Sequence, residues 1–213
     1  FCCYEVPPAP PCSAANLAWV NGDAAIEKPL THWLVLRPIP VPEQSFSTVD
    51  HVDDSDVAVL TPFEVSDERV GPSQQQNCFN SDWFGADGAD SIQPIAGAKQ
   101  SVDGNELVWD PVVSEAGFVE LRSAQRNCDY SIGYAWTEIE VEKDTDAWLA
   151  IGSDDGLKIW LNGQLVHDKW IRRISLIDDE IVPLRLHAGK NRILLKVQNA
   201  IGAWNFVARL RTR

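Results

Sequence analysis

Leu157-Lys-Ile-Trp-Leu-Asn-Gly-Gln-Leu-Val-His167 is the stretch that predicts the fold most directly. Asn162 and Gly163 form the dipeptide that most strongly favours a two-residue hairpin turn, because both central positions of that turn need a positive φ. The apolar residues on either side suit two short antiparallel strands. In this hairpin the predicted cross-strand pairs are Trp160 with Leu165 and Ile159 with Val166.

The segments around this hairpin also read as short strands. Ile193 to Gln198 alternates apolar and polar residues, and the final run from Trp204 to Arg211 does the same, with its arginines on the outer face. Ser131 to Val141 alternates as well, with a change of phase that predicts a bulge. Many short strands at this spacing predict an all-β, two-sheet antiparallel β-sandwich of the jelly-roll type, with long loops, over residues 30–213.

Residues 1–29 read as an extended arm. Val6-Pro-Pro-Ala-Pro-Pro11 favours polyproline II geometry, which is typical of a linker or a free arm that could contact protein partners. The chain starts with Phe1 and contains no methionine, so a leader is expected to have been removed.

Composition excludes two classes of protein. The net charge is −13 with a sequence pI of about 4.6, whereas nucleic-acid binding driven by phosphate neutralisation needs a basic surface. No run approaches the ~20 apolar residues of a membrane-spanning helix. Acidic residues dominate before residue 158 and basic residues after it. This asymmetry could orient an acidic partner or simply attract the two halves of one sandwich.

The five cysteines indicate an extracellular protein. They form no C-x-x-C pair of the zinc-ribbon or thioredoxin kind. Cys78 and Cys128 both lie in polar stretches, which favours a Cys78–Cys128 disulfide, with Cys12 bonded to Cys2 or Cys3. One cysteine remains for an inter-chain bond, a lipid or a free thiol.

The run Gly152-Ser-Asp-Asp-Gly-Leu-Lys-Ile-Trp-Leu-Asn-Gly-Gln-Leu-Val-His-Asp168 resembles a motif of jelly-roll (galactose-binding-like) accessory domains of secreted bacterial proteins. It also resembles the protective-antigen-type sugar-binding domains, whose paired aspartates precede an end similar to Asp168-Lys-Trp170. Trp33-Leu-Val-Leu-Arg-Pro-Ile-Pro40, Trp83 to Pro94 and Gly189 to Val197 extend the resemblance over roughly residues 30–213.

The resemblance implies a calcium site at Asp154 and Asp155, with the ion binding sugar hydroxyls and Asp168 nearby. Independently, adjacent carboxylates in a glycine-bounded loop can face one hard cation, and calcium takes six to eight oxygen ligands. The alternative is an ordinary turn whose carboxylates accept hydrogen bonds from backbone N–H groups.

Carbohydrate binding also needs flat aromatic faces together with fixed polar groups. Trp83, Trp170 and Trp204 lie at loop or strand ends, where a ring could be exposed to a sugar or could pack at the rim of the core. The other tryptophans fall within strand patterns and are expected in the core.

No enzyme signature joins a nucleophile, a base and an orienting group in this sequence. We therefore expect a non-catalytic, extracellular carbohydrate-binding module, calcium-assisted at Asp154 and Asp155, that binds a polysaccharide or glycan. The alternative is a structural or interaction subunit of a cell-surface assembly. Neither interpretation involves nucleic acid or a membrane span.

Overall fold

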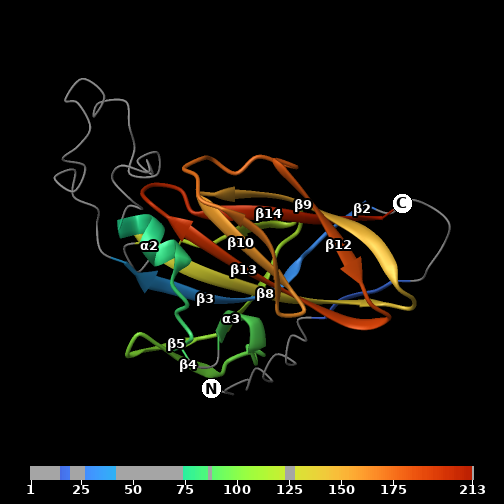
Figure 1. Ribbon diagram of the computed structural model, residues 1–213, viewed down its shortest axis with the longest axis horizontal. Helices are drawn as coiled ribbons and strands as arrows, with labels where there is room; N and C mark the ends of the chain where they lie inside the picture. Colours follow the sequence, from blue (N-terminus) through green and yellow to red (C-terminus); the bar gives the residue numbers. More distant parts are fainter. Residues whose placement is uncertain (1–14, 20–26, 42–73, 86–87, 123–127, 213) are drawn as a thin grey trace, which may run out of the picture.

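The computed structural model describes residues 15–19, 27–41, 74–85, 88–122 and 128–212. The chain folds into two packed β-sheets, which confirms the predicted all-β sandwich (Figure 1). No helix in this part of the chain is long and apolar enough to cross a membrane.

The first sheet has the strand order β11-β10-β13-β8-β3-β6, with β1 beside β8. All its neighbours are antiparallel except β1 and β8, which are parallel. The strands are β1 (Ala15–Trp19), β3 (His32–Pro40), β6 (Asp110–Val113), β8 (Ser131–Val141), β10 (Gly156–Leu161), β11 (Gln164–Lys169) and β13 (Gly189–Asn199).

The second sheet has the order β12-β9-β14-β2, with β7 also paired to β14. A separate two-stranded sheet pairs β4 with β5. These strands are β2 (Glu27–Pro29), β4 (Lys99–Val102), β5 (Asn105–Val108), β7 (Phe118–Glu120), β9 (Thr145–Asp154), β12 (Glu180–Leu186) and β14 (Asn205–Thr212).

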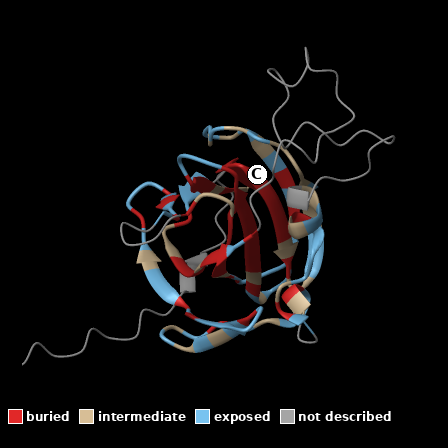
Figure 2. Ribbon diagram, turned by 90° about the vertical axis from the view of Figure 1, so that its left-hand side faces the viewer, coloured by how far each residue is buried: buried red, intermediate tan, exposed pale blue. Residues whose placement is uncertain are grey.

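The main hydrophobic core fills the space between the two large sheets, and Figure 2 shows the buried residues gathered in this interior. Alternation along the strands supplies its side chains, because every second residue of a strand points to the same face. Ile193 and Leu195 of β13 belong to this core together with Leu149 of β9. Trp33 packs edge-on against Phe206, with ring centroids 4.9 Å apart.

A second core covers the outer face of the first sheet. Ile132, Tyr134 and Trp136 of β8 belong to it, together with Phe84 and Trp109. Figure 1 shows α3 and the β4–β5 hairpin on the side of this sheet that faces away from β9 and β14. The helices of this layer are α2 (Gln74–Asn80) and α3 (Gly88–Ser91).

Burial on both faces explains the pattern of β8. The predicted bulge in this strand is wrong, because β8 pairs with β13 in unbroken register from Ser131 to Val141. Its even-numbered apolar residues face the second core, whereas Ile139 and Val141 face the main one. The apolar pattern of β8 therefore changes from even to odd positions because the two faces of the strand are buried in different cores, and not because a residue is inserted.

The hairpin at Asn162 and Gly163 is confirmed, with φ values of 52° and 89° at the two turn residues. Trp160 pairs with Leu165 as predicted. Ile159 instead pairs with His167, because a bulge between Ile159 and Trp160 shifts the register.

The predicted boundary at residue 30 is also corrected. β1 and β2 lie before it and pair with β8 and β14, so the sandwich already includes residues 15–19 and 27–29. The proline-rich stretch of the predicted arm, together with Cys2, Cys3 and Cys12, lies outside the described residues.

Candidate functional site

Asp154 and Asp155 lie where β9 ends and β10 begins, joined by a cis peptide bond. Both residues are buried, with 6% and 2% of their surfaces exposed. The next residue, Gly156, admits no side chain without crowding, since a Cβ there would lie 3.1 Å from the Phe79 ring and 3.4 Å from the Trp170 ring. The packing of these two rings therefore favours glycine at this position.

The Asp155 carboxylate holds two loops. Its Oδ1 accepts a hydrogen bond from the Arg173 N–H at 2.9 Å, and its Oδ2 accepts one from the Ala200 N–H at 2.9 Å. These residues belong to the β11–β12 connection (residues 170–179) and to the loop between β13 and β14. Asp155 thus has the turn-stabilising role that was the alternative to metal binding.

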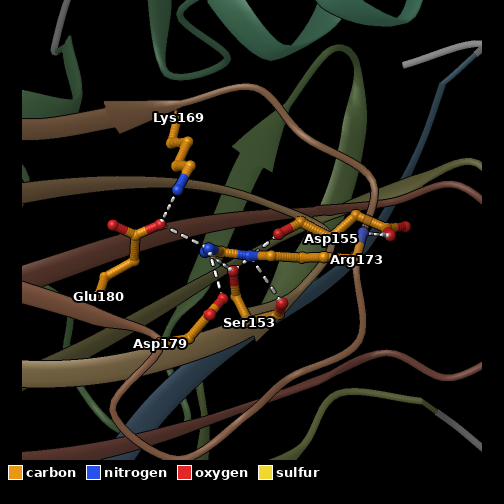
Figure 3. A network of polar contacts seen from close by, with 6 residues as sticks. All are labelled: Ser153, Asp155, Lys169, Arg173, Asp179 and Glu180. Carbon is orange, nitrogen blue, oxygen red and sulfur yellow. Dashed lines mark hydrogen bonds and ion pairs between the residues drawn. The ribbon is translucent and has the colours of Figure 1, made fainter. Parts of the chain in front are cut away.

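Arg173 is the centre of a polar network around the same turn (Figure 3). Its Nη2 donates to the Ser153 Oγ at 2.9 Å and its Nε to the Ser153 carbonyl at 3.2 Å. Its Nη1 donates to Asp179 at 2.8 Å and to Glu180 at 2.6 Å. Glu180 also accepts from Lys169. The side chain of Arg173 therefore makes four hydrogen bonds that fix the β11–β12 connection.

Asp154 differs from its neighbour. No hydrogen bond to its carboxylate joins it to any residue in the described part of the chain. Burial raises its pKa to about 7, and the nearby charges of Asp155 and Glu120 act in the same direction, opposed by Arg172. Burial also raises the pKa of Asp155, to about 6, against the effect of its two backbone hydrogen bonds. Hydrogen bonds and arginine charges thus offset part of the effect of burial at Asp155, whereas only the charge of Arg172 opposes it at Asp154.

Both carboxylates line a cavity of about 390 Å³, which we call the Asp154 cavity. Its volume falls within the usual range for small-molecule sites. Arg172 belongs to its wall, and the residue is exposed. Its other lining residues are Arg173, Ile174, Ile201 and Ala203.

A calcium ion fits the chemistry of this donor set in part. A buried carboxylate without a donor beside a second carboxylate is an arrangement that a dication would stabilise. Each Asp155 oxygen keeps a lone pair beyond its backbone bond. Among the described residues no group of three or more His, Cys, Asp or Glu side chains could hold a metal, so carbonyls, water or ligand hydroxyls would complete the coordination.

The residues predicted to contact sugar do not line the Asp154 cavity. Trp204 is completely buried in the main core, which removes its ring from the surface. Trp170 packs on Phe79, with centroids 5.0 Å apart. Trp83 donates its indole N–H to the Cys78 carbonyl at 2.9 Å.

Asp168 is also directed elsewhere, since its carboxylate pairs with the Lys158 ammonium at 2.5 Å. Sequence reasoning missed Arg172 and Arg173, although two adjacent arginines between β11 and β12 were a visible signal.

The predicted Cys78–Cys128 disulfide is wrong, because no disulfide joins these two cysteines. Cys128 is buried in the main core, whereas Cys78 packs against the second core on the opposite face of the first sheet. Burial raises the pKa of the Cys78 thiol. Polar residues around Cys78 and Cys128 in the sequence therefore did not make these cysteines exposed.

No protein family and no curated protein matches the sequence. Solved structures with a similar backbone include β-rich domains of carbohydrate-active enzymes and of anti-sigma factors. An anti-sigma factor domain-containing protein is 16% identical, with a TM-score of 0.42 over 52% of this chain and 40% of that one.

Glycosidases are among the similar structures. The β-glucosidase from Kluyveromyces marxianus in complex with glucose is 12% identical, with a TM-score of 0.41 over 53% of this chain and 14% of that one. The β-glucuronidase from Bifidobacterium dentium is 17% identical, with a TM-score of 0.41 over 86% of this chain and 22% of that one. The chain thus spans less than half the length of each of these three proteins, and the predicted family resemblance stays a prediction.

Proposed function

We propose that this protein is a non-catalytic, extracellular carbohydrate-binding module whose ligand occupies the Asp154 cavity with the assistance of calcium. The observation that supports the proposal is that Asp154, a residue with 6% of its surface exposed, lines a cavity while its carboxylate receives no hydrogen bond within the described residues. Sugar hydroxyls can complete the coordination of an ion held by Asp154 and Asp155.

The rest of the cavity suits a polyhydroxylated ligand. Arg172 offers guanidinium donors at the rim, and Ile174 and Ile201 offer apolar contact for the faces of a sugar ring. A glycosidase needs two carboxyl groups that flank the scissile bond. Among the described lining residues the only carboxylates are the adjacent pair, and Asp155 is engaged by two backbone groups, which favours binding over hydrolysis.

Isothermal titration calorimetry with CaCl₂ tests the metal part of the proposal. We expect uptake of one ion with a Kd of about 0.1–1 mM, the range of extracellular calcium modules, and loss of uptake in Asp154→Asn. Asp146→Asn is the matched control, because Asp146 lies on the same strand but is exposed and pairs with Arg185. Calcium uptake that survives Asp154→Asn would place the ion elsewhere.

A glycan array probed with and without EDTA tests the sugar part. We expect the wild-type protein to be retained on array glycans, with weaker retention of Asp154→Asn and unchanged retention of Asp146→Asn. Binding that ignores EDTA but still requires Asp154 would support a saccharide site without calcium. An array without any bound glycan would contradict the carbohydrate proposal.

One observation favours an interaction subunit as a second candidate. The β11–β12 connection exposes three aliphatic side chains, Ile174, Leu176 and Ile177, at 68%, 52% and 66% of their surfaces. Apolar side chains grouped in this way often mark contacts with other proteins. Light scattering after size exclusion separates the two functions, because a monomer supports the module and a defined oligomer supports the subunit.

A further inference from the structure

A second cavity of about 400 Å³ lies where α2 and α3 approach the outer face of β10 and β11. It shares no lining residue with the Asp154 cavity. We call it the Trp160 cavity. The lining residues that matter for its chemistry are Asn80, Asp82, Asp90, Lys158, Trp160 and Leu165.

One wall of the Trp160 cavity is apolar and partly flat. Trp160 and Leu165 are direct cross-strand partners, so both side chains lie on the same face of the hairpin. Trp160 is half-buried and packs against the second core, and Leu165 is 45% exposed. An indole ring fixed by packing on one side and open to a cavity on the other is suited to stacking on a ligand ring.

Lys158 supplies a buried donor to this cavity, since only 7% of its surface is exposed. Its ammonium donates to the Asn80 Oδ1 at 3.1 Å and to the Asp168 Oδ2 at 2.5 Å. The ammonium also lies 4.8 Å from the centroid of the Phe79 ring. An ammonium has three N–H donors, so one of them makes no hydrogen bond within the described part of the chain. A ligand oxygen can accept this third hydrogen bond.

Lys158 lies directly opposite Lys196 in the pairing of β10 with β13. Two like charges at opposed positions destabilise a sheet, and here both residues are buried. Lys196 has a structural reason to be there, because its ammonium donates to three carbonyls around the end of α2, those of Cys78, Phe79 and Ser81. Lys158 is held by Asn80 and Asp168 and also lines the cavity, so this buried ammonium is placed where a ligand can reach it.

The cavity also contains carboxylates. Asp82 accepts hydrogen bonds from the Phe84 and Ala89 N–H groups, which fixes its position. Asp90 is exposed, and no described residue donates a hydrogen bond to its side chain. A cationic donor and anionic acceptors in one cavity disfavour a ligand of either net charge, and they suit a neutral molecule whose groups both donate and accept.

We propose that the Trp160 cavity is a second saccharide site, in which a neutral pyranose ring stacks on Trp160 while its hydroxyls bind Lys158 and Asp90. Hydroxyl groups meet the requirement for both donors and acceptors, and the carbon-bound hydrogens of a pyranose face suit an indole. This site extends the proposed function but depends on neither calcium nor Asp154.

The test is a titration of the ¹⁵N-labelled protein with the methyl glycosides of glucose, galactose and mannose in EDTA, followed by two-dimensional NMR. Trp160→Phe assigns the indole N–H signal of Trp160. We expect this signal to shift with at least one glycoside, equally in the wild type and in Asp154→Asn.

Two variants measure the contribution of the cavity. Asp90→Asn and Trp160→Leu should each weaken the binding of the glycoside by about tenfold, as expected for losing one hydrogen-bonded or stacked contact. Asp90 is exposed and without a described partner, so its variant keeps the fold even if Trp160→Leu does not. Trp148→Phe, at a half-buried tryptophan of the other large sheet, is the control and should leave the affinity unchanged.

The outcomes separate the two sites. A Trp160 signal that stays still with all three glycosides overturns the second site, whether or not amides of the β11–β12 connection shift. If the β11–β12 amides do shift, the Asp154 cavity remains a sugar site. A Trp160 shift without any change near Asp154, in calcium as well as in EDTA, would support the second site and count against the Asp154 cavity.

Discussion

At the scale of single residues, two neighbouring aspartates have different tasks. The Asp155 carboxylate accepts one hydrogen bond at each oxygen from backbone N–H groups of two loops, whereas the Asp154 carboxylate lines a cavity without a described donor. Both have a raised pKa, mainly because they are buried. Only Asp155 is compensated by hydrogen bonds, so the two should respond oppositely to substitution.

Asp154→Asn should stabilise the protein in EDTA at neutral and higher pH. A carboxyl group whose pKa rises from 3.8 to about 7 on folding costs nothing when protonated in both states. Its cost grows as the pH rises above about 4 and is complete above about 7. We expect the free energy of unfolding at pH 8 to increase by about 2 kcal/mol and at pH 4 to change little. Urea unfolding at both pH values measures this, and equal changes at both would contradict the assignment.

Asp155→Ala should destabilise the protein at pH 8 by about 2–4 kcal/mol. The substitution leaves the N–H groups of Arg173 and Ala200 without their acceptor, and a buried backbone donor without a partner costs about 1–3 kcal/mol. Thermal melts of this variant beside Asp154→Ala provide the matched comparison. Equal melting temperatures for the two variants would show that the carboxylates are interchangeable.

The sequence predicted this pair of residues but not the tryptophan positions. Two adjacent aspartates between glycines can be recognised from a few consecutive residues, and Asp154 and Asp155 do line one cavity together. The exposure of Trp204 depends on how the β13–β14 loop packs against the first sheet. A Cβ at Gly133 would meet the Trp204 ring at 2.7 Å, a contact between residues far apart in the chain that no local pattern contains.

At the scale of elements, the β11–β12 connection is irregular in backbone yet closely held. Arg173 anchors it to β9, and Asp178 pairs with Arg209 and Arg211 on the outer face of β14. Its carbonyl at Leu176 would lie 1.8 Å from a Cβ at Gly152, so only glycine admits the connection there. Ion pairs and close backbone packing therefore replace secondary structure.

Arg173→Ala should loosen this connection. The substitution removes a 9%-exposed guanidinium that bonds Ser153, Asp179 and Glu180, and breaking such a buried pair costs about 3 kcal/mol. Hydrogen exchange should become faster in residues 170–179. Arg172→Ala, at the adjacent but exposed arginine, should leave stability within about 0.5 kcal/mol of the wild type. Unchanged exchange in Arg173→Ala would refute the anchoring role.

The elements that the sequence predicted are those with a strong local signal. The Asn162-Gly163 turn was clear, but the bulge in the second strand of the hairpin was not, because the sequence does not specify that Val166 is left out of the ladder. The helices α2 and α3 have seven and four residues. Segments this short give no helical periodicity to detect.

At the scale of the whole molecule, two cores share one sheet. β8 contributes Ala135, Ile139 and Val141 to the main core and Ile132, Tyr134 and Trp136 to the second. The layer of α2, α3 and the β4–β5 hairpin therefore packs on a surface that exists only when the sandwich is folded. No composition or spacing in the sequence predicted this second layer.

Unfolding should consequently be a single transition for the two cores. Because loss of the outer layer would expose the apolar outer face of the first sheet to water, we expect the two cores to unfold together. Tryptophan fluorescence and far-ultraviolet circular dichroism should then give the same urea midpoint. Trp109→Phe and Trp33→Phe, one in each core, should shift that midpoint for both probes together. Separate midpoints for the two signals would show that the outer layer unfolds on its own.

Asp155 stabilises the fold whereas Asp154 lines the cavity, so residues of the cavity wall can be changed without removing the contacts that hold the turn. Asp155 joins the turn to residues 173 and 200 whatever the cavity contains, whereas Asp154, Arg172, Ile174 and Ile201 make few contacts that the scaffold requires. A library randomised at these four positions can therefore be selected for new specificities without rebuilding the framework that carries them.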